Sequence, residues 1–333
     1  MTAPSTRRSL GLVVVLLVLL ILLVLSLMIG PTAIAPSVVW DALFHPSADL
    51  DQFAIRDYRL PRTVVGLVVG AALGLSGALI QTLTRNPLAD PGLLGVNAGA
   101  SFAVTVAVGL LGVRDVQGFM WFAFAGALVV TLMVLALGST RQGSSPVFMV
   151  LAGVCVGAVL GGAREALQLT NPDAFDLMRS WGAGSILGRP LQMVWPFLPF
   201  FGVALVLAFV VADPLDAMAL GDDLAVAQGV QLARTRVLAI IALTLLAGGA
   251  TAIAGPIGFV GLMVPHVARW IVGPHQRWIF AYSLLLAPGL LLLSDILGRI
   301  VLPSGEIPVG IVTAFVGAPV LVVLVRRSKA SGL

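Results

Sequence analysis

Long apolar runs alternate with short polar segments along the whole chain. About 20 helical residues cross the hydrocarbon core of a bilayer, and a segment in lipid must satisfy its own backbone hydrogen bonds, as a helix does. The pattern therefore predicts an all-α, polytopic membrane protein that forms a single transmembrane domain over residues 1–333. About ten transmembrane helices are expected, near residues 10–29, 63–84, 93–111, 119–138, 147–167, 193–212, 236–254, 259–273, 278–295 and 309–326.

One of these apolar runs is too long for a single crossing. Residues 237–273 are almost continuously apolar, and a helix of that length would measure more than about 50 Å, beyond a hydrocarbon core of about 30 Å. Gly255 and Pro256 interrupt the run, so we expect two helices joined by a tight turn. The Asn-Pro pair at 86–87 and the Asp-Pro-Gly triplet at 90–92 predict a similar break between the second and third helices.

The first apolar run follows Arg7 and Arg8, and Ala-Ile-Ala at 33–35 resembles a signal-peptidase site. The run is longer than the roughly 7–15 residues of a signal-peptide core, so a retained first transmembrane helix is expected. Positive charge favours the cytoplasmic side of a membrane, which places the N-terminus there. An even number of crossings places the C-terminus there too, and eleven of the 19 lysines and arginines then face the cytoplasm.

Composition agrees with a chain embedded in lipid. Hydrophobic residues make up 59% of the 333 positions and charged residues 10%, whereas soluble domains carry about 25% charged residues. The net charge of +4 does not indicate nucleic-acid binding, because the arginines lie in short gaps between apolar runs. The single cysteine, Cys155, cannot form an internal disulfide, and its place in an apolar run predicts a buried, inert thiol.

Sequence features that could power transport or catalysis are missing. The only lysine is Lys329, near the C-terminus, so the chain has no GxxxxGK[ST] loop and is not expected to hydrolyse ATP or to bind a cofactor. Ionisable residues, which bind coupling ions near the bilayer midplane in proton-coupled carriers, lie near the helix ends. No catalytic residue or metal site is expected, because His45, His266 and His275 are far apart. These absences are best explained if a separate protein drives transport through this chain. A passive channel or secondary carrier is the alternative.

Glycines recur at every fourth position in two of the predicted helices, which places them on one helix face. Such stripes let helices approach closely in lipid. They predict tight helix packing or, alternatively, the lining of a pathway between moving helices. The two stripes are Gly66, Gly70 and Gly74, and Gly153, Gly157 and Gly161.

Three long segments resemble one transporter family. They read RLPRTVVGLVVGAALGLSGALIQTLTRNPLADPGLLGVNAGASF from position 59, GPIGFVGLMVPHVAR from position 255 and SDILGRIVLPSGEIPVGIVTAFVGAP from position 294. The chain is thereby identified as a member of the permeases of iron-siderophore and vitamin B12 ABC importers, the FecCD family, in its enterobactin-type branch. The resemblance implies the ten-helix fold of type II importer permeases, a place in the bacterial cytoplasmic membrane, and transport of a ferric siderophore by alternating access. Vitamin B12 and haem are alternative substrates.

The same resemblance implies partners. In the family, two permease subunits form a central pathway in membrane lipid, two ATPase subunits that hold ATP and magnesium lie beneath it, and a substrate-binding protein docks above. The enterobactin-type resemblance favours a heterodimer of permeases, and a homodimer stays open. The family's docking arginines correspond to Arg59, Arg62 and Arg299, with Arg56 as a further candidate. The alternative role for these side chains is anchoring helix ends at lipid headgroups.

The family's coupling helices, which contact the ATPase, correspond to residues of about 214–232. This segment is the longest polar stretch on the expected cytoplasmic side, and a solvated loop is the alternative. Gln228 replaces a leucine that is common in the family. A third match, Pro265, His266 and Arg269, is expected near the cytoplasmic end of the eighth helix, without an assigned role. The coupling residues implied are Leu220, Gly221, Asp222, Asp223, Ala225 and Gly229.

Overall fold

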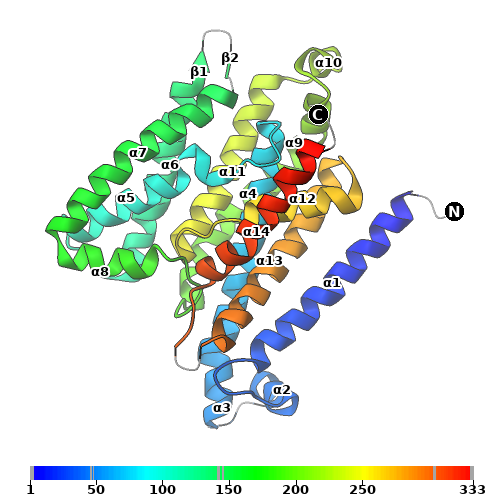
Figure 1. The fold of residues 1–333 in the computed structure, drawn as a ribbon. Coiled ribbons are helices and arrows are strands. Elements are labelled where there is room, and N and C mark those ends of the chain that lie inside the picture. Colours follow the sequence, from blue (N-terminus) through cyan, green and yellow to red (C-terminus); the bar gives the residue numbers. More distant parts are fainter. Residues whose placement is uncertain are drawn as a thin grey trace.

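The computed structural model describes residues 4–45, 47, 49–140, 143–144, 146–302 and 305–330, and their fold is a helical bundle (Figure 1). Seven helices of this part are long and apolar enough to cross a membrane, and three shorter apolar helices, α5, α12 and α14, occupy the remaining predicted runs. The ten elements are α1 (Pro4–Met28), α4 (Leu60–Leu83), α5 (Val96–Gly109), α6 (Val116–Gly138), α7 (Pro146–Thr170), α9 (Leu198–Ala219), α11 (Leu232–Ala254), α12 (Val260–Val272), α13 (Gln276–Ile300) and α14 (Val309–Ala330).

Shorter elements connect the long helices and mark the two ends of the bundle. We call the end with α2 and α3 the α2 end and the opposite end the α10 end; α1 begins and α14 finishes in the half that carries α10 (Figure 1). The all-α fold class is confirmed, and a short antiparallel pair of two-residue strands, β1 and β2, is the small addition to it among the described residues. The short elements are α2 (Pro36–Phe44), α3 (Leu50–Phe53), the π-helix η1 (Ala54–Arg59), the 3₁₀ helices η2 (Pro91–Leu94), η3 (Leu191–Met193) and η4 (Trp195–Phe197), α8 (Pro172–Trp181), α10 (Asp222–Ala227), β1 (Ser139–Thr140) and β2 (Gly143–Ser144).

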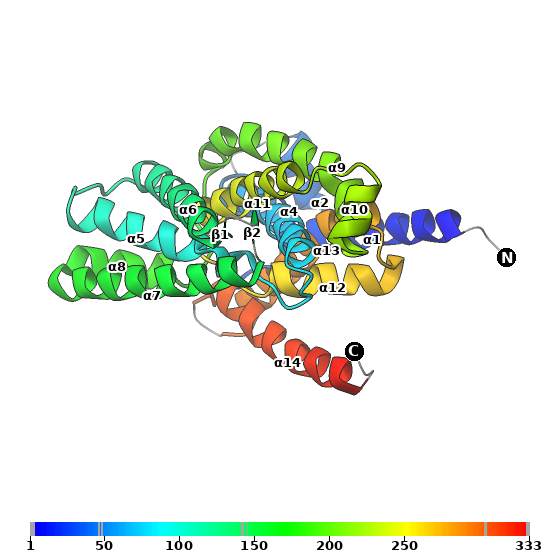
Figure 2. The same ribbon diagram turned by 90° about the horizontal axis from the view of Figure 1, so that it is seen from above.

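Helix α4 lies at the centre of the bundle and packs against α11, α12 and α13. Its small residues permit this, because a Cβ on Gly77 would lie only 1.8 Å from the carbonyl oxygen of Gly261 in α12. Seen from above, α5, α6, α7 and α8 lie together on one side of the molecule, where α6 packs against α11, and α14 lies outside the central helices (Figure 2). Large apolar side chains stay exposed on α1 and α7, as expected for helices that contact lipid or another subunit.

The predicted helix breaks are confirmed. Helix α11 ends at Ala254 and α12 begins at Val260, while α4 ends at Leu83 and α5 begins only at Val96. Turn-forming side chains explain the second break, because Asp90 Oδ1 accepts a hydrogen bond from the Gly92 N–H at 2.8 Å.

Some boundaries and one burial prediction were wrong. Helix α9 continues to Ala219, beyond the predicted residue 212, because its acidic residues have partners: Asp216 accepts a hydrogen bond from the Gln276 N–H at 3.0 Å, and Asp213 pairs with Arg277 at 2.6 Å. Cys155 is exposed, not buried, because α7 leaves most of its surface uncovered by the rest of the chain.

Candidate functional site

The segment predicted to couple to an ATPase lies at the α10 end as a short helix between two glycine corners (Figure 1). Gly221 has φ 126° and Gly229 has φ 82°, a range that favours glycine because it lacks a Cβ. A Cβ on either residue would meet no atom within 4 Å. Both glycines therefore serve backbone conformation and not close packing, and they set the direction of α10.

Asp222 fastens α10 to two long helices. Its carboxylate pairs with Arg236 of α11 at 2.6 Å and with Arg85, just beyond the end of α4. Arg85 also donates to the carbonyl oxygen of Met218 in α9 at 2.6 Å. Burial alone would raise the pKa of the Asp222 carboxyl, but the guanidinium groups of Arg236 and Arg85 outweigh it and hold the pKa below its ordinary value.

The outer face of this segment is apolar and exposed. Leu220, Leu224 and Val226 each leave more than half of their surface accessible, whereas Ala225 is fully buried against the bundle. Asp223 has no ion pair among the described residues. An exposed apolar ridge on a short helix that is anchored by ion pairs has the form of a surface that inserts into a groove of another protein.

At the opposite, α2 end, three of the four predicted docking arginines have partners within the chain. Arg62 and Arg299 share the buried carboxylate of Asp295, with N–O distances of 2.7 and 2.5 Å, and Arg62 also pairs with Glu306 at 2.5 Å. Arg299 further donates to the carbonyl oxygen of Ser26 at 2.7 Å. These contacts join α1, α4 and α13.

Arg59 and Arg56 differ in their surroundings. Arg59 is buried and donates to the carbonyl oxygens of Leu27, Met28 and Thr32 at 2.7–2.9 Å, which holds the chain that leaves α1. Arg56 is exposed. The docking role of these arginines stays a prediction, and in this conformation only Arg56 presents its side chain freely at the surface.

Arg59, Arg62 and Arg299, but not Arg56, line a hollow of about 420 Å³, which we call the arginine pocket. Four segments that are distant in sequence meet there: the α1–α2 connection, η1 with the start of α4, the stretch before η3, and the end of α13 with the following loop. Its polar lining includes Arg59, Arg62, Arg189, Arg299, Asp57, Tyr58 and Glu306.

The two glycine stripes have different environments. A Cβ on Gly70 would lie 2.6 Å from the Pro288 Cα, and one on Gly74 would lie 2.4 Å from the Ala287 Cβ. Gly66, in the same stripe, lies close to Leu292. Helix α4 therefore packs on α13 through this stripe. In α7, a Cβ on Gly153 would lie 1.9 Å from the Leu93 carbonyl oxygen. Farther along α7 the glycines are no longer tightly packed against other elements. A Cβ on Gly157 would make only ordinary van der Waals contact, and one on Gly161 would meet nothing within 4 Å.

The motif on α12 forms a polar junction with α4. Pro265 lies inside α12 and has no N–H for the carbonyl of Gly261, one turn earlier. The Gln81 side-chain amide reaches this position and donates to the carbonyl oxygens of Gly261 and Leu262 at 3.3 and 2.9 Å, while its oxygen accepts from Arg269 at 3.4 Å.

His266 lies on the same helix as this junction. Its ring packs edge-on against Trp270, with centroids 4.7 Å apart.

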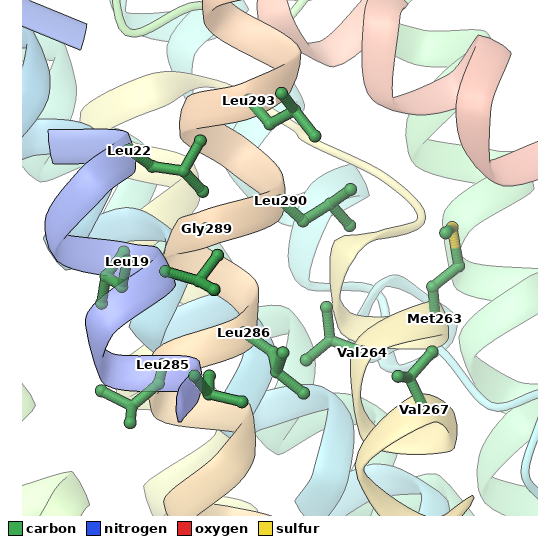
Figure 3. Close-up of a pocket in the computed structure, with 12 residues that line it drawn as sticks. Leu19, Leu22, Met263, Val264, Val267, Leu285, Leu286, Gly289, Leu290 and Leu293 are labelled. Carbon is green, nitrogen blue, oxygen red and sulfur yellow. The ribbon is translucent and has the colours of Figure 1, made fainter. Parts of the chain in front are cut away.

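A second hollow, of about 260 Å³, lies between α1, α12 and α13 (Figure 3). Aliphatic side chains such as Leu19, Leu286 and Val264 line it, and a surface of this kind suits lipid chains and not a charged chelate. Among the described residues, no three histidine, cysteine or acidic side chains gather where they could hold a metal ion.

Sequence reasoning missed several residues of these sites. Asp295 and Glu306 form ion pairs with Arg62, and Arg85 and Arg236 form ion pairs with Asp222. The Gln81 side chain donates to a backbone carbonyl oxygen of α12. Asp295 and Arg299 are spaced i, i+4 in an apolar helix, and two opposite charges at this spacing in lipid are a usable signal. The other contacts join residues that lie 14 to 244 positions apart, so no local pattern reveals them.

Residues 18–327 match the FecCD transport family. The chain is 49% identical over 309 residues, 92% of each chain, to the ferric enterobactin transport system permease protein FepD of Escherichia coli (strain K12). It is 36% identical, over 91% of each chain, to a probable siderophore transport system permease protein of Bacillus subtilis (strain 168). A solved metal-chelate type ABC transporter in an inward-facing conformation gives a TM-score of 0.83 at 28% identity, and the match covers 95% of this chain and 98% of that one.

Proposed function

Because the chain belongs to the FecCD transport family, we propose that it is the membrane-spanning permease subunit of an ATP-driven importer for a ferric siderophore of the enterobactin class. The substrate class is inferred from the Escherichia coli relative, which belongs to a ferric enterobactin transport system. The permease works in the bacterial inner membrane with both termini in the cytoplasm, so that the α10 end faces inward and the α2 end outward.

The observation that carries this proposal is the construction of α10. A passive channel has no need for an exposed apolar helix that ion pairs attach to its central helices. The ridge of Leu220, Leu224 and Val226 fits a groove on an ATPase subunit. Because Asp222 joins α10 to Arg85 and Arg236, a displacement of α10 moves α4 and α11 with it.

ATP and magnesium belong to two partner subunits in this proposal, and this chain supplies mechanical coupling. A second permease subunit completes the pathway, and a heterodimer is favoured. Helix α7 is the best candidate for the shared surface, because it exposes apolar side chains along its length and its glycine stripe opens at Gly157 and Gly161. Near Gly157 and Gly161, two such helices can approach and slide past each other without interlocking large side chains, which suits alternating access.

Paired substitutions test the proposal in the reconstituted complex. Asp222→Asn removes the charge that holds Arg85 and Arg236. Asp213→Asn is the matched control, since it breaks an ion pair of the same length, 2.6 Å, that joins α9 to Arg277 of α13 and does not involve α10. Ferric enterobactin uptake into proteoliposomes and transport-stimulated ATP hydrolysis are measured for both variants. We expect uptake to fall several-fold for Asp222→Asn and to stay near the wild-type rate for Asp213→Asn, because exposed ion pairs contribute little.

A second variant addresses the glycine corners. Gly221→Asp places a side chain at φ 126°, which L-residues rarely adopt, and uptake is expected to collapse while insertion into the membrane persists. Uptake that continues without ATP, or that survives both Asp222→Asn and Gly221→Asp, would support a passive channel or secondary carrier instead.

A further inference from the structure

The hollow between α1, α12 and α13 takes no part in coupling or in the arginine pocket. We call it the aliphatic hollow, and Figure 3 shows α1 and α12 on its two sides with α13 between them. Apart from Met263 and Gly289, every residue that lines it is a leucine or a valine. Val18 and Leu293 belong to this lining and are exposed. The hollow therefore opens toward the membrane and is not sealed inside the bundle.

Helix α1 is fastened to its neighbours on both sides of the hollow. At the α10 end, the Tyr282 hydroxyl of α13 donates to the Arg8 carbonyl oxygen at 2.7 Å. At the α2 end, Arg299 of α13 donates to the Ser26 carbonyl oxygen at 2.7 Å. The space between these two contacts is therefore a fixed groove beside α1 and does not result from a detached helix.

Arg8 places a positive charge at the α10 end of this groove. Arg8, Val15 and Leu22 follow each other at intervals of seven residues, so they share one face of α1. The Arg8 Nη2 lies 3.7 Å from the position that a Cβ on Gly273 would take, at the end of α12. Within the described part of the chain, the Arg8 side chain forms no hydrogen bond or ion pair. Its guanidinium is available to a ligand that lies between α1 and α12.

Helix α12 continues the groove from the hollow to Arg8. Val264 and Val267 line the hollow, and Ile271 follows on the same face, because residues three and four apart on a helix are neighbours. Ile271 is exposed. An apolar surface on α12 thus leads from the aliphatic hollow to the charge at Arg8.

The separation of charge and hollow matches the dimensions of a phospholipid. The α1 residues that line the hollow, Val15 to Leu22, lie 7 to 14 positions beyond Arg8, which corresponds to about 10–20 Å along the helix. Half of a hydrocarbon core is about 15 Å thick, so an acyl chain reaches the hollow when its headgroup contacts Arg8. The arginine fork can donate two hydrogen bonds to phosphate oxygens.

We propose that the groove between α1 and α12 binds an anionic phospholipid, with its phosphate at Arg8 and one acyl chain in the aliphatic hollow. The lipid belongs to the leaflet at the α10 end, which is the inner leaflet when both termini lie in the cytoplasm. A negative headgroup is favoured over a zwitterionic one because the two helices carry Arg7, Arg8 and Arg269 and no acidic residue.

Native mass spectrometry of the assembled importer tests the headgroup contact. Dissociation constants are measured for dioleoylphosphatidylglycerol and for zwitterionic dioleoylphosphatidylcholine. Arg8→Gln removes the charge and keeps the hydrogen bond from Tyr282, which goes to the backbone. Arg7→Gln is the matched control, because Arg7 is exposed and points about 100° away around α1. We expect Arg8→Gln to weaken phosphatidylglycerol binding about fivefold, Arg7→Gln to change it little, and neither to affect phosphatidylcholine.

A second pair of variants tests the acyl-chain contact. Gly289→Leu fills the hollow, and the site accepts a side chain, since a Cβ on Gly289 would lie 3.5 Å from Leu22, an ordinary contact. Gly202→Leu is the control, because Gly202 lies on the exposed surface of α9 and a Cβ there would meet no atom within 4 Å. We expect Gly289→Leu to weaken binding of both lipids several-fold and Gly202→Leu to leave it unchanged.

Three results would overturn the lipid site. Equal losses for Arg8→Gln and Arg7→Gln would mean diffuse attraction by surface charge, and wild-type lipid binding by Gly289→Leu would mean an unused hollow. Binding of phosphatidylglycerol by the isolated chain but not by the assembled importer would mean that another subunit covers the groove. Transport is not measured in any of these experiments, so a failure of the importer to carry ferric siderophore would bear on the proposed function alone.

Discussion

Asp295 is the residue on which the α2 end depends most. It is buried in α13 and accepts from both Arg62 and Arg299. Asp295→Asn would leave two buried guanidinium groups with one carboxylate, Glu306, between them. Breaking a buried pair in this way costs about 3–5 kcal/mol, so we expect a markedly lower Tm in detergent for Asp295→Asn.

Asp173→Asn provides the comparison for that experiment. It breaks the Arg114–Asp173 pair, which is also short, at 2.6 Å, but highly exposed. Exposed pairs contribute about 0–1 kcal/mol, so its Tm should stay near wild type. Equal effects of Asp295→Asn and Asp173→Asn would contradict a supporting role for the buried cluster.

Acidification should release α10 through Asp222. Its pKa is held below the ordinary value, so the ion pairs stabilise the folded segment fully above about pH 4, near the unfolded pKa of aspartate, and this stabilisation is lost as the pH falls through the lower folded pKa. Hydrogen exchange of the α10 amides, corrected for its intrinsic pH dependence, should show added protection at pH 7 that declines as the pH falls below about 4. Asp222→Asn should lack that protection at every pH.

The candidate site residues could be found in the sequence, but their burial and their contacts were harder to predict. The family resemblance brought out Arg59, Arg62 and Arg299, but sequence gives no measure of burial, and their partners Asp295 and Ser26 come from helices that meet only in three dimensions. Arg189 shows the same limit from the other side. Nothing in its sequence neighbourhood distinguishes it from other arginines of the loops, and its place in the lining of the arginine pocket appears only in the structure.

At the scale of elements, the two glycine stripes lead to opposite expectations for the same change. Gly70→Ala places a methyl group 2.6 Å from the Pro288 backbone, which cannot move aside, and overpacking of this kind costs about 1–3 kcal/mol. Gly161→Ala meets no atom within 4 Å and gains up to about 1 kcal/mol of helix propensity. Tm values of the isolated chain should therefore fall for Gly70→Ala and be unchanged or rise for Gly161→Ala. A lower Tm for Gly161→Ala would show that α7 packs differently.

Long helices were predictable because lipid imposes one physical requirement on length and polarity. The short helices α2 and α8 were not predicted, because they form at bundle ends, where neighbouring helices and caps decide the backbone, and α10 was expected only through the family resemblance. Asn171 illustrates this: it caps α8 by accepting from the Ala174 N–H at 3.0 Å and also donates to the Gly109 carbonyl oxygen of α5 at 3.0 Å. The second contact depends on tertiary structure that no local pattern contains.

At the scale of the whole molecule, α7 has a face that the chain does not cover, and the natural cysteine reports on it. Cys155 is exposed on this helix, beside Leu151 and Val159, which are also exposed. If α7 meets the second permease subunit, a membrane-permeant maleimide should label Cys155 quickly in the isolated chain and several-fold more slowly in the assembled importer. Val206→Cys in a Cys155→Ala background is the control, because Val206 is exposed on α9 and should be labelled at the same rate in both states. Equal rates at Cys155 in both states would mean that α7 faces lipid and that the second subunit binds elsewhere.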